Sequence, residues 1–176
     1  MPYVNEIEEF QANPQLRELY RSIEQHFGFI PHYFKALGTM PNAIAGQLKL
    51  NEAVMCDGAL STVVKEEIGV VVSGINSSAY CIFIHMELLQ RFGVDKALAR
   101  KLTTEYENAA VEPKVKALFR FADKLTRKPY DIEDEDIETL KKAGWDDAAV
   151  RETVLTVAYF NYVNRVSLGL GLVADF

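Results

Sequence analysis

The chain has 176 residues, of which 49% are hydrophobic and 25% charged, a composition typical of globular proteins. With 19 Lys and Arg against 25 Asp and Glu, the net charge is −6. This charge argues against nucleic acid as a partner, because phosphate binding needs a basic surface. No run of about 18 apolar residues is present, so no membrane span is expected. A chain of this length can bury its own core without disulfides or metal.

Cysteine usage and the first residues predict where the protein resides. Only Cys56 and Cys81 are present, which is too few for a disulfide scaffold and favours a reducing compartment. Residues 1–10 contain no Lys or Arg and no continuous apolar stretch, so a secretory signal is not expected. We therefore predict a cytoplasmic protein.

Residues 1–60 predict three helices. The first ends at Gly28, ahead of Pro31. Helical segments over 32–40 and 42–55 follow, before a break in the pattern near Cys56. The apolar residues that set the helical period of the first segment are Leu16, Leu19, Tyr20, Ile23 and Phe27.

Residues 61–92 predict a pair of helices. Ser61 is suited to cap the first of them, whose Val-rich stretch 68–75 is short enough to resemble a strand. Because this stretch continues a helical start, we interpret it as part of a buried helix. The second helix is expected to run from Ser78 to about Phe92.

The rest of the chain also predicts helices, over 95–108, 114–127, 134–143 and 146–164. The last of these is apolar on nearly every side, so it must be covered by its own domain or by another subunit. Strict strand alternation is absent. The sequence therefore predicts an all-α, single-domain fold with N-terminal helices in 1–60, a core hairpin in 61–92 and C-terminal helices in 93–176.

Glu66 and His85 are expected to face each other across the helical pair. Glu66 lies 10 residues before Asn76, and His85 lies 9 residues after it. At 1.5 Å per residue both are about 14 Å from the turn, so antiparallel helices bring them to the same level. Gly69 and Ser73 share a face with Glu66 and are small enough to let the second helix approach.

Ser78, Cys81 and His85 share one face of the second helix, at positions i, i+3 and i+7. Cys81 is expected in the first turn, where unpaired N–H groups and the helix dipole stabilise negative charge on a sulfur. Ser78 could donate a hydrogen bond to that sulfur. The sequence therefore predicts a thiol and an imidazole one turn apart, near a carboxylate.

The spacing of these residues resembles the signature of the AhpD-like, carboxymuconolactone decarboxylase family. That signature has a Glu, a Cys-x-x-Cys pair beginning twelve residues later, and a His four residues after the second Cys. Here Glu66 precedes Ser78 by 12 residues. Cys81 follows Ser78 by 3 residues and precedes His85 by 4. Further segments resemble the peroxidase-related branch of the family, namely Phe27–Pro31, Gly58–Ser61, Phe160–Arg165 and Gly169–Gly171.

The resemblance implies a fold built on an antiparallel helical hairpin that assembles as homo-oligomers, either trimers or hexamers. It also implies that Cys81 attacks peroxide while His85 and Glu66 relay protons. Ser78 stands where the family has its resolving cysteine, so no disulfide can form between residues 78 and 81. An external thiol would then have to act as the reductant.

Each of these residues also has a purely structural interpretation. Cys81 could be a small core side chain, His85 a hydrogen-bonded core histidine, and Ser78 only an N-cap. Glu66 could be a favourable acid near a helix N-terminus, with Glu67 as a competing carboxylate. A metal site formed by Cys81, His85 and Glu66 lacks a fourth ligand, so no metal is expected.

Three functions remain open. In the first, Cys81 reduces a hydroperoxide and is regenerated by an external thiol. In the second, the Glu66–His85 pair performs acid–base chemistry on a small organic acid or lactone, as on the decarboxylase side of the family, and Cys81 is dispensable. In the third, the protein is an oligomeric scaffold or binding module without turnover. No cofactor is expected in any of them.

Overall fold

The computed structural model describes residues 2–175, and every regular element within that range is a helix. The prediction of an all-α fold is confirmed, and the Val-rich stretch 68–75 is helical. The α-helices are α1 (Pro14–Phe27), α2 (His32–Ala36), α3 (Pro41–Met55), α4 (Thr62–Ile75), α5 (Ala79–Arg91), α6 (Lys96–Thr104), α7 (Pro113–Arg127), α8 (Asp134–Lys142) and α9 (Asp147–Gly169). Short 3-10 helices are η1 (Glu9–Gln11), η2 (Tyr106–Asn108) and η3 (Pro129–Asp131).

The predicted boundaries differ from the observed ones at a few helix ends. α2 stops at Ala36, short of the expected residue 40. The segment predicted over 95–108 divides into α6 and η2, because Glu105 between them leaves the helical region at φ −143°. α9 continues past the expected end at residue 164 to Gly169.

Polar side chains fix the starts of the helices that carry the core. The side chain of Asn13 accepts a hydrogen bond from Leu16 N at the start of α1, at 2.8 Å. Ser61 caps α4 by accepting from Val64 N at 3.3 Å, as the sequence predicted. These caps satisfy N–H groups that have no partner inside the helix.

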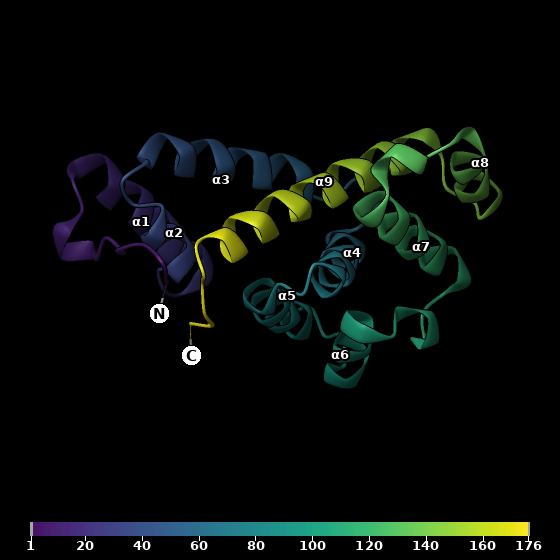
Figure 1. Cartoon of the computed structure of the whole chain (residues 1–176), viewed down its shortest axis with the longest axis horizontal. Coiled ribbons are helices and arrows are strands. Elements are labelled where there is room, and N and C mark those ends of the chain that lie inside the picture. Colours follow the sequence, from purple (N-terminus) through teal and green to yellow (C-terminus); the bar gives the residue numbers. More distant parts are fainter. Residues whose placement is uncertain (1, 176) are drawn as a thin grey trace.

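Helix α4 lies at the centre of the fold and packs against α5, α6, α7 and α9 (Figure 1). Its Ile68, Val70, Val71 and Val72 are at most 1% exposed, so this apolar helix is buried on all sides. The long helix α9 runs diagonally across the molecule, and α3 packs along part of it. The helices α1 and α2 close one end, near both chain termini (Figure 1). The interpretation of residues 68–75 as buried helix is therefore confirmed.

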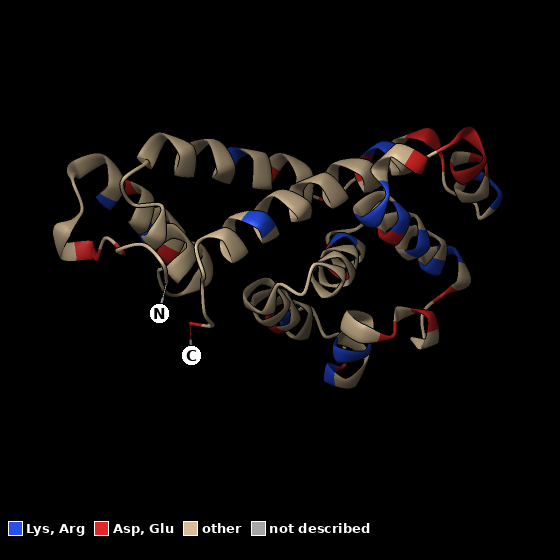
Figure 2. Cartoon of the chain, viewed as in Figure 1, with Lys and Arg blue, Asp and Glu red and all other residues tan. Residues whose placement is uncertain are grey.

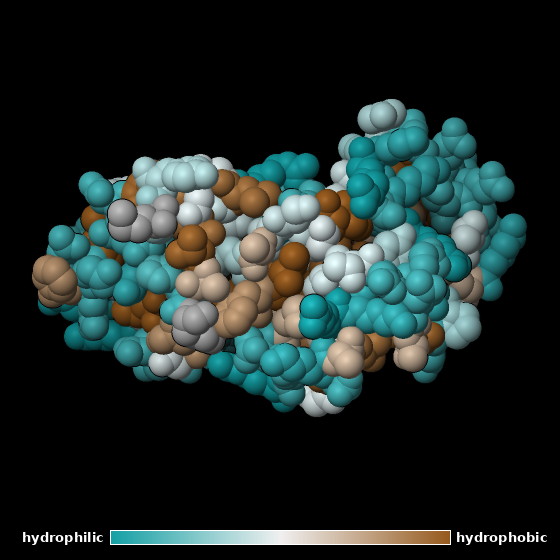
Figure 3. Space-filling view, turned by 60° about the horizontal axis from the view of Figure 1, so that its bottom comes forward, coloured by the Kyte–Doolittle hydropathy of each residue, from teal (hydrophilic) through white to brown (hydrophobic). Residues whose placement is uncertain are grey.

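Charged residues are distributed unevenly over the surface. Acidic residues gather at the start of α8 and basic residues along α7, at one end of the molecule (Figure 2). In the view of Figure 3, hydrophilic residues cover most of that end, whereas apolar side chains reach the surface over the middle. No helix within residues 2–175 is long and apolar enough to cross a membrane.

Helix α9 is not covered on all sides within this chain. One side of it leaves apolar residues at the surface: Val154, Leu155, Tyr162 and Leu168 are between 37% and 53% exposed. The domain itself covers only part of α9, so the alternative that another subunit covers the helix concerns this exposed side.

Candidate active site

The hairpin between α4 and α5 brings Glu66 and His85 together. The turn includes Ser77 in the left-handed region, with φ 54°, and closes with a hydrogen bond from Ser78 N to Ser73 O at 2.9 Å. His85 Nδ1 then lies 2.7 Å from Glu66 Oε2. The contact predicted from residue counting is therefore confirmed, and Glu66 rather than Glu67 is the carboxylate that reaches the imidazole.

The Glu66 contact orients the imidazole of His85. With Nδ1–H donating to the carboxylate, the neutral ring presents Nε2 as a proton acceptor. Within residues 2–175, Nε2 has no hydrogen-bond partner. The ring of His85 also packs edge-on against Phe160, with centroids 4.6 Å apart. The imidazole is thus held in one orientation with one nitrogen available for proton transfer.

The small residues Gly69 and Ser73 of α4 contact α9 and not α5, which was the neighbour expected. A Cβ added at Gly69 would lie 2.0 Å from the ring of Phe160, and Ser73 Oγ accepts a hydrogen bond from Asn164 Nδ2 at 3.0 Å. Both contacts are with α9, not α5. The prediction that Gly69 and Ser73 make room for α5 is therefore wrong. Gly69 instead admits the ring that supports His85.

Cys81 lies in the first turn of α5, with Ser78 at the N-cap position. It is 3% exposed, and its Sγ is 3.4 Å from the hydroxyl of Ser167 on α9. Ser78 does not use its side chain as a cap, and its Oγ is 3.0 Å from the same Ser167 hydroxyl. The expected Ser78–Cys81 hydrogen bond is therefore replaced by two hydrogen bonds that meet at Ser167.

The hydroxyl of Ser167 can form a hydrogen bond with Cys81 whether the sulfur is a thiol or a thiolate. A hydroxyl oxygen accepts from a thiol, and the same hydroxyl donates to a thiolate after it rotates. In the structure the Ser167 hydroxyl donates to Asn164 O at 3.0 Å, which leaves its lone pairs for Ser78 and Cys81. Together with the N-terminal turn of α5, this arrangement suits a sulfur that changes protonation state.

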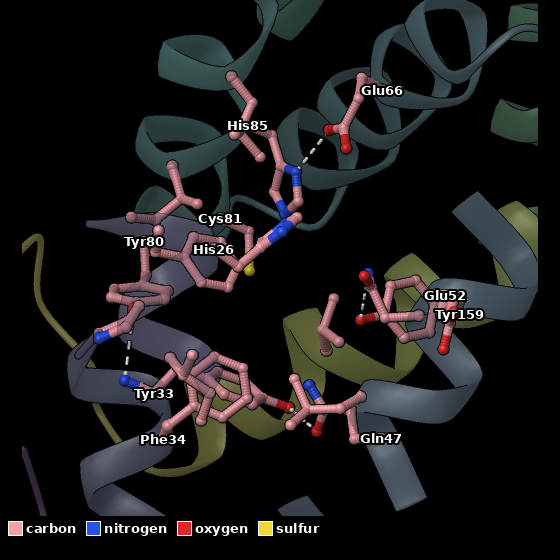
Figure 4. Close-up of a pocket in the computed structure, with 18 of the residues that line it drawn as sticks. His26, Tyr33, Phe34, Gln47, Glu52, Glu66, Tyr80, Cys81, His85 and Tyr159 are labelled. Atoms are coloured by element: carbon pink, nitrogen blue, oxygen red, sulfur yellow. Dashed lines mark hydrogen bonds and ion pairs between the residues drawn. The ribbon is translucent and has the colours of Figure 1, made fainter. Parts of the chain in front are cut away.

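Cys81, His85 and Glu66 line one pocket of about 550 Å³ (Figure 4). Figure 4 shows them on one side of the cavity, with Gln47 and Tyr159 across from them. Most of the lining is apolar or aromatic, from α1, α3, α5, α9 and the segment around α2. It includes Ile23, Phe27, Pro31, Phe34, Leu48, Ile84, Leu88 and Val163.

Three buried tyrosines line the same pocket as the sulfur. Tyr33 donates a hydrogen bond to Gln47 Oε1 at 2.9 Å, and the Tyr80 hydroxyl accepts one from Tyr33 N at 3.3 Å. Burial raises the pKa of Tyr33 and of Tyr80 well above the ordinary value for a phenol. Burial also raises the pKa of Tyr159 to about 12. All three therefore keep their protons near neutral pH.

Sequence reasoning missed Tyr159, Ser167 and Gln47 as residues of the site. No local signal marked Ser167, which lies beyond the end predicted for this helix at residue 164. Cys56 is exposed, whereas Cys81 is buried, and both are free thiols. Among the described residues, no group of three or more His, Cys, Asp or Glu side chains is placed to hold a metal ion.

No family model matches the chain, and no curated protein matches it. The fold is nevertheless shared with solved structures, and it is the fold of AhpD-like, peroxidase-related proteins. A protein from Ralstonia eutropha JMP134, described as an alkylhydroperoxidase AhpD core, superposes with a TM-score of 0.92 at 23% identity, over 99% of this chain and 92% of that chain. A peroxidase-related protein from Silicibacter sp. TM1040 gives 0.88 at 24% identity, over 96% and 90%.

A further similar structure is a Cys-to-Ala variant of the debrominase Bmp8 in complex with 2,3,4-tribromopyrrole. It gives a TM-score of 0.84 at 20% identity, over 98% of this chain and 91% of that chain. At these identities the likeness concerns the fold.

Proposed function

We propose that this protein is a thiol peroxidase in which Cys81 reduces an organic hydroperoxide with the help of the Glu66–His85 pair. The observation that carries the proposal is that the sulfur and this hydrogen-bonded pair line the same pocket of about 550 Å³. The volume and the apolar lining suit a small organic molecule. The fold shared with peroxidase-related proteins agrees with this assignment.

In the proposed reaction one proton passes from the thiol to the leaving alkoxide, and the sulfur is oxidised by two electrons while the peroxide is reduced. Nε2 of His85 receives the thiol proton, and Glu66 stabilises the resulting imidazolium. The Cys81 thiolate attacks the terminal oxygen of the hydroperoxide, so an S–O bond forms and the O–O bond breaks. The leaving alkoxide takes the proton from His85. The products are a sulfenic acid at Cys81 and an alcohol.

Regeneration requires a thiol from outside the chain. Ser78 stands where a resolving cysteine would be needed, and a hydroxyl cannot form a disulfide. An external thiol condenses with the sulfenic acid, releasing water and forming a mixed disulfide, and a second thiol releases Cys81. We propose that a small-molecule or protein thiol fills this role.

The test is thiol-dependent consumption of tert-butyl hydroperoxide. We expect Cys81→Ser to abolish turnover, because no other side chain in the pocket can form a sulfenic acid. Cys56→Ser is the matched control, since it removes the exposed thiol outside the pocket, and it should keep wild-type rates. Mass spectrometry with a sulfenic-acid trap should find the label at Cys81. Wild-type turnover in Cys81→Ser would overturn the proposal.

A second candidate function uses only the acid–base pair. It is favoured by the 2.7 Å contact between His85 and Glu66, which does not involve the sulfur and opens into a pocket that can hold a small organic acid. In that case Cys81→Ala keeps most of the activity on the organic acid and His85→Ala abolishes it. The two variants therefore separate the candidates.

A further inference from the structure

Tyr159 lies across the cavity from Cys81, on α9, and its hydroxyl is held by α3. Asn51 Nδ2 donates to the Tyr159 hydroxyl oxygen at 3.0 Å. The side chain of Tyr159 is 7% exposed, and it lines the same pocket as Cys81 and Glu66. In Figure 4 its hydroxyl points toward the interior of the cavity. A buried phenol at the wall of the pocket is thus fixed in place by a donor to its oxygen.

Of the described side chains, Asn51 and Gln47 interact with this hydroxyl, and both contacts lower the pKa of Tyr159, as groups that donate to its oxygen do. The nearby amide oxygen of Gln47 already accepts hydrogen bonds from Tyr33 at 2.9 Å and from Tyr162 at 3.3 Å. Two such bonds occupy the two lone pairs of a carbonyl oxygen. Asn51 contributes its N–H group, not its oxygen, to Tyr159. A buried donor without an acceptor is rare, because its desolvation is not compensated.

The electrostatic surroundings keep this donor protonated. Burial is the largest cause that raises the pKa of Tyr159 to about 12, and it outweighs the hydrogen bonds from Asn51 and Gln47, which lower the pKa. The phenol therefore does not compete with His85 as a base. It remains a neutral hydrogen-bond donor that lines the same pocket as the sulfur and the acid–base pair.

We propose that the Tyr159 hydroxyl donates a hydrogen bond to the leaving oxygen of the hydroperoxide while Cys81 attacks the terminal oxygen. This inference rests on the proposed peroxidase function. Tyr159 is a catalytic residue in this scheme because it touches the atom on which negative charge develops. It keeps its own proton throughout, since the thiol proton reaches the alkoxide through His85, and the balance of the reaction is unchanged.

A donor at the leaving oxygen matters in proportion to the charge on that oxygen. An alkyl hydroperoxide expels a strongly basic alkoxide, whereas a peroxyacid expels a weakly basic carboxylate that needs little help. Removing one donor at a developing oxyanion costs about 10²–10³ in rate. Tyr159 should therefore be important for the alkyl substrate and nearly dispensable for the peroxyacid.

The experiment compares the rate constants with which tert-butyl hydroperoxide and peracetic acid oxidise Cys81 in a single turnover, without reductant. Tyr159→Phe should slow the alkyl hydroperoxide by about 10²-fold. The rate with the peroxyacid should change by less than about threefold, because a hydrogen-bond donor stabilises the weakly basic carboxylate leaving group only slightly. Tyr106→Phe is the matched control. It removes a phenol hydroxyl that donates to Asp123 away from the pocket, so both rates should stay at the wild-type values.

The outcomes separate this inference from the function on which it rests. Equal slowing of both substrates by Tyr159→Phe means that the hydroxyl only supports the fold of the pocket, and it overturns the inference. An unchanged rate with tert-butyl hydroperoxide overturns it as well. A wild-type protein whose Cys81 reacts with neither oxidant defeats the peroxidase proposal itself, and the role of Tyr159 with it.

Discussion

Two neighbouring residues of α4, Lys65 and Glu66, are both charged and both buried, yet they belong to different kinds of structure. Lys65 pairs with Glu152 at 3.0 Å and donates to Cys56 O at 2.6 Å. Glu152 in turn accepts from the backbone N–H groups of Ala59 and Leu60, both at 2.9 Å. Both charged groups of this cluster therefore have partners among the described residues.

The Glu66 cluster is incomplete by comparison. Its carboxylate holds one nitrogen of His85, and the other nitrogen has no partner within the described residues. The difference shows how two buried charges can be told apart. The Lys65–Glu152 cluster secures the loop ahead of α4, whereas the Glu66–His85 pair leaves one imidazole nitrogen without a partner among the described residues at the wall of the pocket.

The pKa of Glu152 is consistent with a structural role for the Lys65–Glu152 cluster. Although burial opposes it, hydrogen bonds from Leu60, Ala59 and Lys65 together hold the pKa of Glu152 below its ordinary value. The carboxylate is therefore kept ionised as a fixed structural element. A group committed in this way to three donors has no capacity left to exchange protons with a substrate.

The largest effect is expected from Glu66→Gln, and it concerns activity. The amide keeps the shape of the side chain but cannot stabilise an imidazolium, so peroxide turnover should fall by about 10²–10⁴-fold. The free energy of unfolding should change little, because the pair contributes only one hydrogen bond. Steady-state kinetics and urea unfolding on the same samples check both parts. A variant that loses stability but keeps turnover would show that Glu66, like Lys65, has only a structural role.

The converse change, Glu152→Ala, should act on stability. It leaves Lys65 buried and uncompensated, which costs about 3–5 kcal/mol of unfolding free energy. Turnover per folded molecule should remain close to wild type. Lys65→Met combined with Glu152→Gln is the matched control, because it removes both charges but keeps a side-chain oxygen for the N–H groups of Ala59 and Leu60, and it should recover most of the loss. Failure of that double variant to recover stability would contradict the assignment of Glu152 as a charge partner.

A smaller, pH-dependent effect is expected at Glu67, the third consecutive buried charged residue. Burial raises the pKa of Glu67 from the ordinary 4.5 to about 7. The native state therefore binds this proton more tightly than the unfolded chain does. The contribution of Glu67 to the unfolding free energy should be highest below about pH 4.5 and should decline until the folded pKa is passed, by about 3 kcal/mol in total.

Glu67→Gln removes the group that titrates and should remove this dependence. Relative to wild type, the variant should gain about 2–3 kcal/mol near pH 8 and nothing near pH 4. Urea unfolding across that pH range measures the difference. A gain of the same size at both ends would show that the effect comes from packing rather than from the proton.

Local pattern was sufficient to predict the helices and the one contact that depends on counting along the chain. Glu66 meets His85 because the rise of two helices from a common turn is fixed, and no other information is needed. Gly69 was assigned to the wrong neighbour because a small residue shows where something approaches, but not which segment approaches. The identity of that segment depends on long-range packing.

The α9 residues of the site had no comparable local signal. Tyr159 and Ser167 lie in a helix whose apolar residues point in nearly every direction, so its period does not distinguish the side that faces the pocket. Their roles follow from contacts that span large separations, 108 residues for Asn51 to Tyr159 and 86 for Cys81 to Ser167. A single sequence does not specify such pairs.

The late position of α9 has a consequence for how the protein is made. During translation, Cys81 and His85 emerge from the ribosome long before Ser167, which follows Cys81 by 86 residues. A nascent chain that ends before α9 lacks the hydroxyl beside the sulfur, the Phe160 ring beneath the imidazole and one wall of the cavity. The thiol therefore acquires its full set of neighbours only when synthesis of α9 is complete.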